Sequence, residues 1–406
     1  MKNKELAVNG GRPVRDTFLP ASRECLDEAD ISAVVNVLRR GNLCGGELVA
    51  ALEERFAGYA GVRYAVAVSS GGAGLHITAA AAGISLREEV IVSSLSPLAD
   101  ACFAKYMGGG TVFADIDTHT YNVDPVEVRH QLTPGTRAIV AAHYAGQPCD
   151  LEAIHGLARE NGLTVVEDAS CALGAEYQGR RVGALSDMTV FSFERGEGPV
   201  AGGGGMVTTG SEELYQWLKV FRSNGVVSDP RLMIKNEGPW YFEMQELGFP
   251  YRMTELQAAL GLSQLAKAGA FLRRREEIAE RYNRAFAGMK TLAIPEVLPG
   301  VRPAWTMYVL SLRLERLAQG RSAIYDALRA ENIGVAVPDP PLHRHPFFIW
   351  QGHKDVCTLE GSLCPRADDL YETFLLLPVY PALTDGDVTD VIQAVYKVLD
   401  NYSDNL

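Results

Sequence analysis

The sequence predicts an α/β protein, with a large domain built on a mostly parallel, doubly wound β-sheet and a smaller C-terminal α+β domain. Short runs rich in valine and isoleucine alternate with amphipathic stretches up to about residue 250. The runs are apolar almost without interruption, as parallel strands covered on both faces require. The length of 406 residues, of which 47% are hydrophobic and 22% charged, is typical of a globular chain of this size.

Six of these runs are predicted to be buried strands: Arg63–Ser69, Glu89–Ser93, Gly110–Ala114, Arg137–Ala142, Leu163–Glu167 and Met188–Phe193. Helical patterns lie between them at Ala73–Ala82, Pro97–Tyr106 and Leu151–Asn161. In a doubly wound sheet, ligands bind outside the carboxyl ends of the strands. The residues that follow these strands are therefore the first candidates for a functional site.

A longer helical pattern over roughly Thr254–Phe286 is expected to bridge into the C-terminal domain, with Gly261 and Gly269 as its weakest points. Beyond it, a strand is predicted at Thr306–Leu314 and helices at Ser322–Asn332 and Asp385–Asp400. The chain is thus predicted to divide in two. Residues 1–255 form the large α/β domain with an N-terminal arm, and residues 256–406 form the bridging helix and the small domain.

The charge balance argues against nucleic acid as a partner. The 50 acidic side chains outnumber the 38 basic ones and give a formal net charge of -12, whereas nucleic acid is bound by clustered lysines and arginines. No apolar run reaches the roughly 18 residues of a membrane span, and the first residues lack the apolar core of a signal peptide. We therefore expect a cytoplasmic protein that binds neither nucleic acid nor membrane.

The seven cysteines are scattered along the chain and never occur as Cys-x-x-Cys pairs. This pattern indicates neither a disulfide framework nor a zinc site. No other metal site is predicted, and a reducing compartment is expected.

A glycine-rich turn, Ser69-Ser70-Gly71-Gly72-Ala73, follows the first predicted strand and opens a helix. Backbone N–H groups at a helix start, approached closely where glycine lacks a side chain, can hold an anion such as phosphate. A tight strand-to-helix turn accounts for the same residues equally well. The turn matches neither the G-x-G-x-x-G pattern of dinucleotide sites nor a Walker loop.

Asp168 lies just past a predicted strand, in the segment Glu167–Cys171. A carboxylate there is poorly solvated and needs a partner, either a protein cation or a protonated nitrogen of a ligand. Capping of the following segment is the simpler alternative. Cys171 could act as a nucleophile only with a nearby base, for which the strand order makes His143 a candidate. Most isolated cysteines are inert core residues.

Ser192 lies between two aromatic strand residues, Phe191 and Phe193, before the chain enters a glycine-rich turn. Its side chain points to one face of the strand, where it could reach a phosphate. The acidic residues of the turn, Glu194 and Glu197, are interpreted most simply as solvated loop residues.

Taken together, these segments resemble the DegT/DnrJ/StrS family of sugar and aminocyclitol aminotransferases, which have the fold-type-I architecture of pyridoxal phosphate (PLP) enzymes. The most specific blocks are Glu167–Gly183 and Tyr251-Arg252-Met253. The similarity covers nearly the whole chain, with further matches at Leu6–Arg15, Leu26–Gly41, Ile139–Gly146, Phe191–Phe193, Leu247–Leu265 and Arg273–Tyr282. The opening LAVNGGRPVR most resembles the branch of scyllo-inosose aminotransferases and aminohydroxybenzoate synthases.

The resemblance implies a homodimer that binds PLP and a small-molecule substrate between its domains, at the subunit interface. Asp168 falls at the family's aspartate, which pairs with the pyridine nitrogen of the cofactor. Ser192 falls at a phosphate contact, and Gly71, Gly72 and Ala73 fall in the turn that holds the phosphate. Pro97 falls at the aromatic residue that stacks on the cofactor ring.

The Schiff-base lysine of the family has no counterpart in this chain. By the resemblance it lies four residues after the Phe-Ser-Phe motif, at Glu197. The chain has only nine lysines, and none lies between Lys105 and Lys219. A carboxylate cannot form an imine, and it cannot become the neutral amine that moves the proton in transamination. The resemblance therefore implies that residue 197 cannot support ordinary transamination.

Other positions also depart from the family pattern. Gly72 replaces a hydroxyl residue of the phosphate turn, Pro97 the stacking aromatic residue, and Cys171 a glutamine or histidine. Gly203 replaces a glutamate. Pro250 replaces an asparagine that reaches the phosphate bound to the partner subunit, and it offers neither a side-chain amide nor an N–H group. Each lost contact is worth about 1–3 kcal/mol, so cofactor binding should be weakened by orders of magnitude.

Three hypotheses for the function follow. The first is an enzyme repurposed within sugar, aminocyclitol or other natural-product metabolism, with no cofactor or with non-covalent pyridoxamine phosphate (PMP) or PLP. Its catalytic residues would be Glu197, Asp168, Cys171 and His143; in a PMP-dependent, dehydratase-like version Glu197 is the base. The second is a non-catalytic homologue that binds or regulates an active aminotransferase. The third, a conventional aminotransferase, would need a lysine from elsewhere, such as Lys235.

Overall fold

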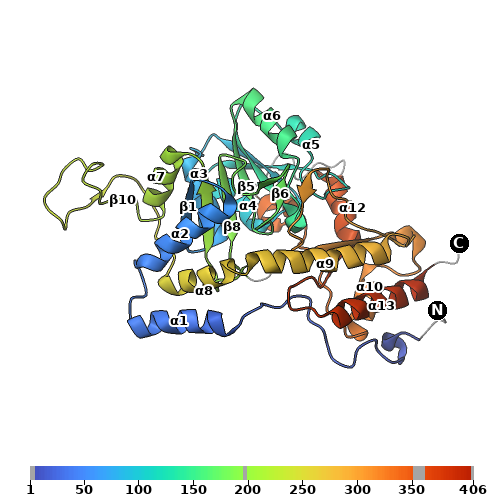
Figure 1. Ribbon diagram of the computed structural model, residues 1–406. Helices are drawn as coiled ribbons and strands as arrows, with labels where there is room; N and C mark the ends of the chain where they lie inside the picture. The colour runs from blue at the N-terminus through green and yellow to red at the C-terminus, as the bar shows by residue number, and fades with distance from the viewer. Residues whose placement is uncertain (1–4, 195–198, 351–361, 404–406) are drawn as a thin grey trace.

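The computed structural model of the protein describes residues 5–194, 199–350 and 362–403. Its largest element is a seven-stranded sheet with the order β1-β9-β8-β5-β4-β2-β3, which helices cover in Figure 1. β9 pairs antiparallel with β1 and β8, and the remaining neighbours pair parallel. The predicted α/β class and the mostly parallel sheet are therefore confirmed.

All six predicted strands form, and each end lies within one residue of its predicted position. Their side chains are almost all buried, which explains why the apolar runs are continuous. The strands of the sheet are β1 (Tyr64–Val68), β2 (Glu89–Ser93), β3 (Gly110–Ala114), β4 (Thr136–Ala142), β5 (Thr164–Asp168), β8 (Met188–Ser192) and β9 (Gly205–Thr209).

β9 is missing from the predicted strands because the glycines before it, Gly202–Gly205, are typical of a turn. It lies between β1 and β8, with Tyr64 opposite Thr209 and Ser192 opposite Gly205. Since β8 and β9 are antiparallel neighbours, the chain leaves the sheet at the carboxyl end of β8 and returns to it at the same end. The strands β4 and β5 also terminate at this end of the sheet.

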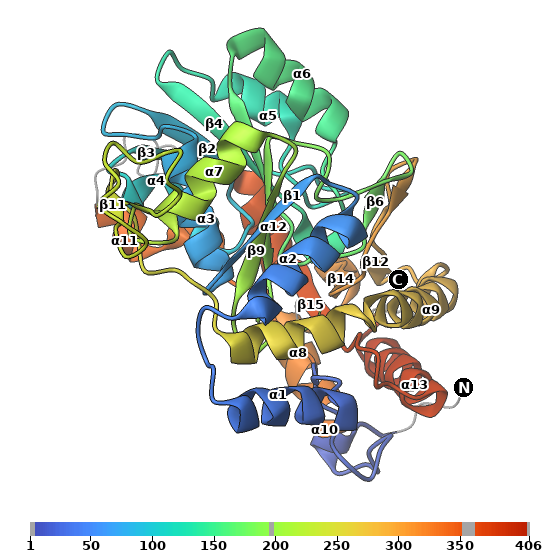
Figure 2. The same cartoon turned by 60° about the vertical axis from the view of Figure 1, so that its left-hand side comes forward.

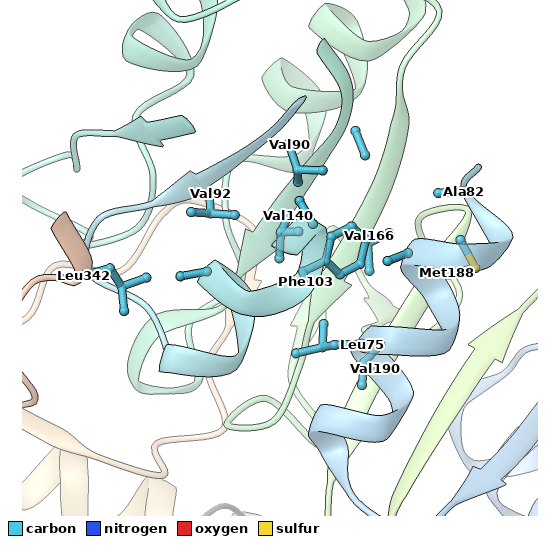
Figure 3. Close-up of a cluster of buried hydrophobic side chains, with 14 of the residues drawn as sticks. Leu75, Ala82, Val90, Val92, Phe103, Val140, Val166, Met188, Val190 and Leu342 are labelled. Atoms are coloured by element: carbon cyan, nitrogen blue, oxygen red, sulfur yellow. The ribbon is translucent and has the colours of Figure 1, made fainter. Parts of the chain in front are cut away.

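The two faces of the sheet bury alternate residues of the same strands. On one face, Leu75 of α3 (Gly71–Ala81) and Phe103 of α4 (Leu98–Tyr106) pack with Val90, Val140 and Val166 (Figure 3). On the other face, residues one position away in those strands pack under α5 (Pro125–His130) and α6 (Leu151–Asn161). This sandwich of helix, sheet and helix fixes the carboxyl ends of the strands as one rigid edge.

The long helical pattern that follows divides into α8 (Glu255–Leu265) and α9 (Ala268–Phe286). The break does not fall at either glycine of the pattern but at Lys267, whose ammonium group binds Asp27 and Asp30 at 3.0 and 2.6 Å. These acids belong to the start of α1 (Glu28–Arg40). Figures 1 and 2 show α8 between α1 and α2 (Glu47–Ala60).

A second, three-stranded sheet has the order β12-β14-β15. The predicted strand and the two predicted helices of this region form as β14, α10 and α13. The elements here are β12 (Leu292–Ala293), β14 (Tyr308–Leu312), β15 (Phe374–Leu377), α10 (Arg321–Ala330) and α13 (Asp385–Tyr402). The division of the chain at residue 255 stays a prediction.

The N-terminal arm packs onto the core of this second sheet rather than onto the large sheet. Leu6 and Leu19 belong to the same apolar cluster as Leu310 and Val395. The buried carboxylate of Glu331 accepts hydrogen bonds at 2.9 Å from the amides of both Ala7 and Val14. Its charge is balanced by Lys397, whose Nζ lies 2.7 Å away.

Shorter elements complete the described fold. They are α7 (Glu212–Phe221), α11 (Pro346–Trp350), α12 (Pro365–Thr373), β6 (Glu176–Tyr177), β7 (Arg180–Arg181), β10 (Val226–Val227), β11 (Glu243–Met244), β13 (Val301–Arg302) and the 3₁₀ turns Ala7–Asn9, Tyr144–Gly146, Leu314–Arg316 and Leu342–Arg344. The segment from β10 to β11, here called the arm loop, projects away from the body of the molecule (Figure 1).

In the described part of the chain, no helix combines the length and apolar character needed to cross a bilayer. The same residues contain no group of three or more His, Cys, Asp or Glu side chains placed to hold a metal ion.

Candidate functional site

A cavity of about 380 Å³ lies at the carboxyl ends of β4 and β5. Ala142 and Asp168, the last residues of these strands, line its floor. The walls come from distant parts of the chain, including Arg23 of the N-terminal segment, Arg275 of α9 and Tyr380 of the loop after β15. The site thus lies where ligands of doubly wound sheets are expected, and the C-terminal region closes it.

The structure brings four of the predicted site residues to this cavity: Pro97, His143, Asp168 and Cys171 all line it. The predicted phosphate turn, Gly71 to Ala73, and Ser192 are not among the lining residues. Glu197 lies outside the described residues. Val200, three positions further on, lines the cavity.

Asp168 is 3% exposed, so its carboxylate depends on protein hydrogen bonds. Its Oδ1 accepts two of them from Ser170, one from the amide at 2.9 Å and one from the hydroxyl at 2.6 Å. Asp168 therefore caps the following turn, as the simpler alternative predicts, and it also lines the cavity. The amide of His143 donates to the backbone oxygen of Asp168 at 3.0 Å and joins the two strand ends.

Asp100, which the sequence did not single out, contacts Asp168 from the first turn of α4. Complete burial is the main cause that raises the pKa of Asp100 well above its ordinary value, and the charge and hydrogen bond of Asp168 raise it further. No cationic side chain in the described ranges pairs with it. The raised pKa favours the protonated, neutral form of Asp100 beside Asp168.

Both ring nitrogens of His143 form hydrogen bonds with residues other than Cys171. Its side chain is 0% exposed, and its Nε2 lies 2.8 Å from a carboxylate oxygen of Glu167. Its Nδ1 accepts a hydrogen bond from the amide of Cys149 at 3.2 Å, so the proton sits on Nε2. A role as the base for Cys171, one of the sequence hypotheses, would require one of these bonds to break.

Glu167 completes this buried pair. Burial alone would raise its pKa, but the hydrogen bond and charge of His143, together with hydrogen bonds from Ser186 and Thr189, hold the pKa of Glu167 below its ordinary value. The carboxylate is ionised and orients the imidazole ring. We expect His143 and Glu167 to position the strand ends.

The turn before α3 is built around its own hydrogen bonds. Ser70 caps the helix, because its Oγ accepts from the amide of Ala73 at 3.0 Å. Gly71 lies against Ser192, since a Cβ atom at position 71 would approach the Cβ of Ser192 to 2.8 Å. The turn and Ser192 are thus brought together, as the resemblance implies, but they lie outside the lining of the cavity.

These observations test whether the described residues fit a covalently bound PLP. Such a site needs a lysine and a phosphate cradle that open into one cavity. No lysine occurs among the described lining residues, and the turn before α3 is absent from them. The described residues do not fit the covalent cofactor, and no catalytic step is derived through it.

Two further lining residues escaped the sequence analysis. Tyr144 is half-buried as a residue, but its hydroxyl group is buried without a hydrogen-bond partner among the described residues; burial raises its pKa. Arg275 is 4% exposed. An available signal for Asp100 was that it is the one acid in the largely apolar helix Leu98–Tyr106. Arg275 gave none, since it is the third of three consecutive arginines.

Comparison with known proteins defines the class. The model of the DegT/DnrJ/EryC1/StrS aminotransferase family matches residues 24–396, and the chain belongs to this family. It is 38% identical over 386 residues to the uncharacterized protein MJ1066 of Methanocaldococcus jannaschii, covering 95% of this chain and 99% of that one. It is also 38% identical to the spore coat polysaccharide biosynthesis protein SpsC of Bacillus subtilis, over 95% and 98% of the two chains.

Solved structures agree with this class. The aminotransferase TlmJ from Streptoalloteichus hindustanus has a TM-score of 0.85 at 32% identity, covering 95% of this chain and 99% of that one. The expected family and aminotransferase fold are thus confirmed.

Proposed function

We propose that this protein is an enzyme that acts on a small sugar-type or aminocyclitol substrate without forming a Schiff base to a lysine. The distribution of lysines carries the proposal. None lies between Lys105 and Lys219, and none is among the described residues that line the cavity. The reaction is therefore not ordinary transamination.

The substrate class is supported by relatives that match almost end to end. SpsC is named for spore coat polysaccharide biosynthesis, and TlmJ is described as an aminotransferase. A substrate of sugar, aminocyclitol or other natural-product metabolism is consistent with these names and with a cavity of about 380 Å³.

The chemistry would centre on the floor of the cavity. Asp168, which lines the cavity, would hold a hydroxyl or protonated nitrogen of the ligand. Cys171 lies on the same wall. Glu197, placed by the family resemblance at the lysine position, would act as the base.

A second candidate is a PMP-dependent, dehydratase-like enzyme. Asp168 favours it, since a carboxylate at the cavity floor is where the family resemblance places the partner of the cofactor's pyridine nitrogen. Bound non-covalently, PMP would supply an electron sink. Glu197 would again be the residue that holds or moves the proton.

Incubation with PLP, reduction with borohydride and intact-mass measurement test the absence of a Schiff base. We expect no covalent adduct on the wild-type chain. The variant Glu197→Lys is the matched control, because a primary amine at that position should be trapped as an adduct if the resemblance places it correctly.

A wild-type adduct mapped by peptide mass to Lys235 or another lysine would overturn the proposal. PMP can be titrated by calorimetry in parallel. Saturable binding favours the dehydratase-like candidate, and no binding favours the cofactor-free enzyme. A chain that purifies in a stoichiometric complex with an active aminotransferase, without turnover of its own, would instead support the non-catalytic hypothesis.

We also propose that the protein is a homodimer. The arm loop and the turn after it expose a group of large apolar side chains: Leu232, Ile234, Trp240, Phe242, Met244 and Leu247. Of these, Ile234 is 87% exposed and Trp240 76%. Apolar groups gathered on a projecting segment favour burial against another subunit.

A further inference from the structure

Arg275 is the one arginine of α9 that is buried and also lines the cavity. Its side chain belongs to a residue that is 4% exposed. Its Nε is inaccessible and has no hydrogen-bond partner among the described residues. The adjacent Arg274 differs, because it binds the backbone oxygen of Leu383 and ion-pairs with Glu277 and Asp385, both at 2.9 Å.

Among the described residues, no acid forms an ion pair with Arg275. The described acidic residues that line the cavity are Glu24, Asp168 and Asp339, and none of them is ion-paired with Arg275. The charges of Tyr59 and Cys171 favour the charged form of Arg275. Burial lowers the pKa of Arg275 to about 10, which leaves the guanidinium charged at neutral pH.

A buried guanidinium without a partner destabilises the folded chain, since desolvation is not offset by an ion pair or by hydrogen bonds. A residue that only supported the fold would be paired, as Arg222 is with Glu53 and the backbone oxygen of Ala67. An unpaired cation that opens onto a cavity is instead what a site for an anion requires before its ligand arrives.

We propose that Arg275 is the anion-binding residue of the cavity and receives a carboxylate or phosphate group of the substrate. The planar guanidinium fork matches two oxygens of either group. Arg23, an exposed residue that also lines the cavity, adds a second positive charge. The inference deepens the proposed function by assigning an acidic substrate to the same cavity.

The test uses the full chain and two simple probes, inorganic phosphate and acetate, at constant ionic strength. Binding is measured by calorimetry and by the shift in melting temperature for wild type, Arg275→Gln, Arg275→Lys and the control Arg274→Gln. We expect wild type and Arg274→Gln to bind one of the probes with equal affinity. Arg275→Gln should bind it at least tenfold more weakly, and Arg275→Lys should fall between.

The ligand-free proteins provide the second measurement. Because Arg275 has no ion-pair partner among the described residues, Arg275→Gln should melt at or above the wild-type temperature, whereas Arg274→Gln should melt below it. Equal binding of both probes by wild type and Arg275→Gln would overturn the proposal, and so would a lower ligand-free melting temperature of Arg275→Gln. Preference for phosphate or for acetate identifies which group the subsite takes.

These measurements need no cofactor and no turnover. A lysine adduct in the borohydride experiment would therefore defeat the proposed function while leaving the anion site intact. Loss of the anion site would leave the proposed chemistry at Asp168 untouched.

Discussion

Asp100 and Arg275 show two ways for an ionisable side chain to exist inside this protein. Asp100 is buried against another acid, and both burial and the charge of Asp168 raise its pKa, which favours the protonated form. Arg275 remains charged near neutral pH, since even its lowered pKa is about 10. The charge of Asp100 should therefore change with pH, whereas the charge of Arg275 should be balanced by the proposed anionic ligand.

The protonation of Asp100 predicts a pH-dependent stability. Because its pKa is raised in the folded state, the folded chain binds this proton more tightly than the unfolded chain. Stability is then lost as pH rises above the ordinary aspartate value of about 3.9, by up to about 1.4 kcal/mol per pH unit until Asp100 ionises. The variant Asp100→Asn offers Asp168 an amide N–H donor and has no proton to lose.

We therefore expect Asp100→Asn to melt at a higher temperature than wild type at pH 8, with the difference shrinking toward pH 4. The groups that face Asp100 are Asp168, Ser96, Cys102 and Cys149, and all are retained in the variant. Asp326→Asn, at an exposed helix position, should follow the wild-type profile. Parallel profiles for wild type and Asp100→Asn would show that Asp100 is not protonated.

Among the helices and strands, the sequence predicts those elements that are determined by a local pattern of residues. The six predicted parallel strands are recovered because each is an apolar run bounded by turn residues. β9 is not, since its glycine-rich start hides a strand that only its neighbours β1 and β8 define. The break between α8 and α9 depends on an ion pair from Lys267 to Asp30, 237 residues earlier in the chain.

The residues of the candidate site likewise divide into those that a local pattern predicts and those that it does not. Asp168 and Cys171 follow a strand whose end could be predicted, and both line the cavity. Asp100 and Arg275 come from helices, and their meeting with the strand ends depends on tertiary packing that no local pattern encodes.

Glu331 ties the N-terminal arm to α10 and α13, which predicts a stability effect far from the cavity. Replacement of Glu331 by Ala removes the acceptor of two backbone amides and leaves the charge of Lys397 buried and unpaired. We expect the free energy of unfolding, from urea denaturation, to fall by about 3–5 kcal/mol.

The exposed Glu315 lies in the same region and serves as the control for Glu331. Glu315→Ala should change the free energy of unfolding by less than about 0.5 kcal/mol. An equal, small effect of both variants would mean that the arm is held by its apolar contacts, such as those of Leu6 and Leu19.

For the whole molecule, the arm loop predicts the state of association. Two charges placed by the double variant Ile234→Glu and Trp240→Glu would have to be buried in the proposed dimer, at a cost of several kcal/mol. We expect light scattering on a sizing column to give the mass of a dimer for wild type and of a monomer for the double variant. Leu86→Glu, at an 83% exposed position outside the arm loop, should remain dimeric.

The antiparallel pair of β8 and β9 has a consequence for how chemistry changes in this fold. The amide of Phe193 donates to the backbone oxygen of Gly204, and the oxygen of Phe193 accepts from the amide of Ala201, both at 3.0 Å. These bonds fix the pairing of the described residues on either side of position 197. The sequence between them can therefore be exchanged in evolution, or transplanted from a relative in the laboratory, while the strand register stays unchanged.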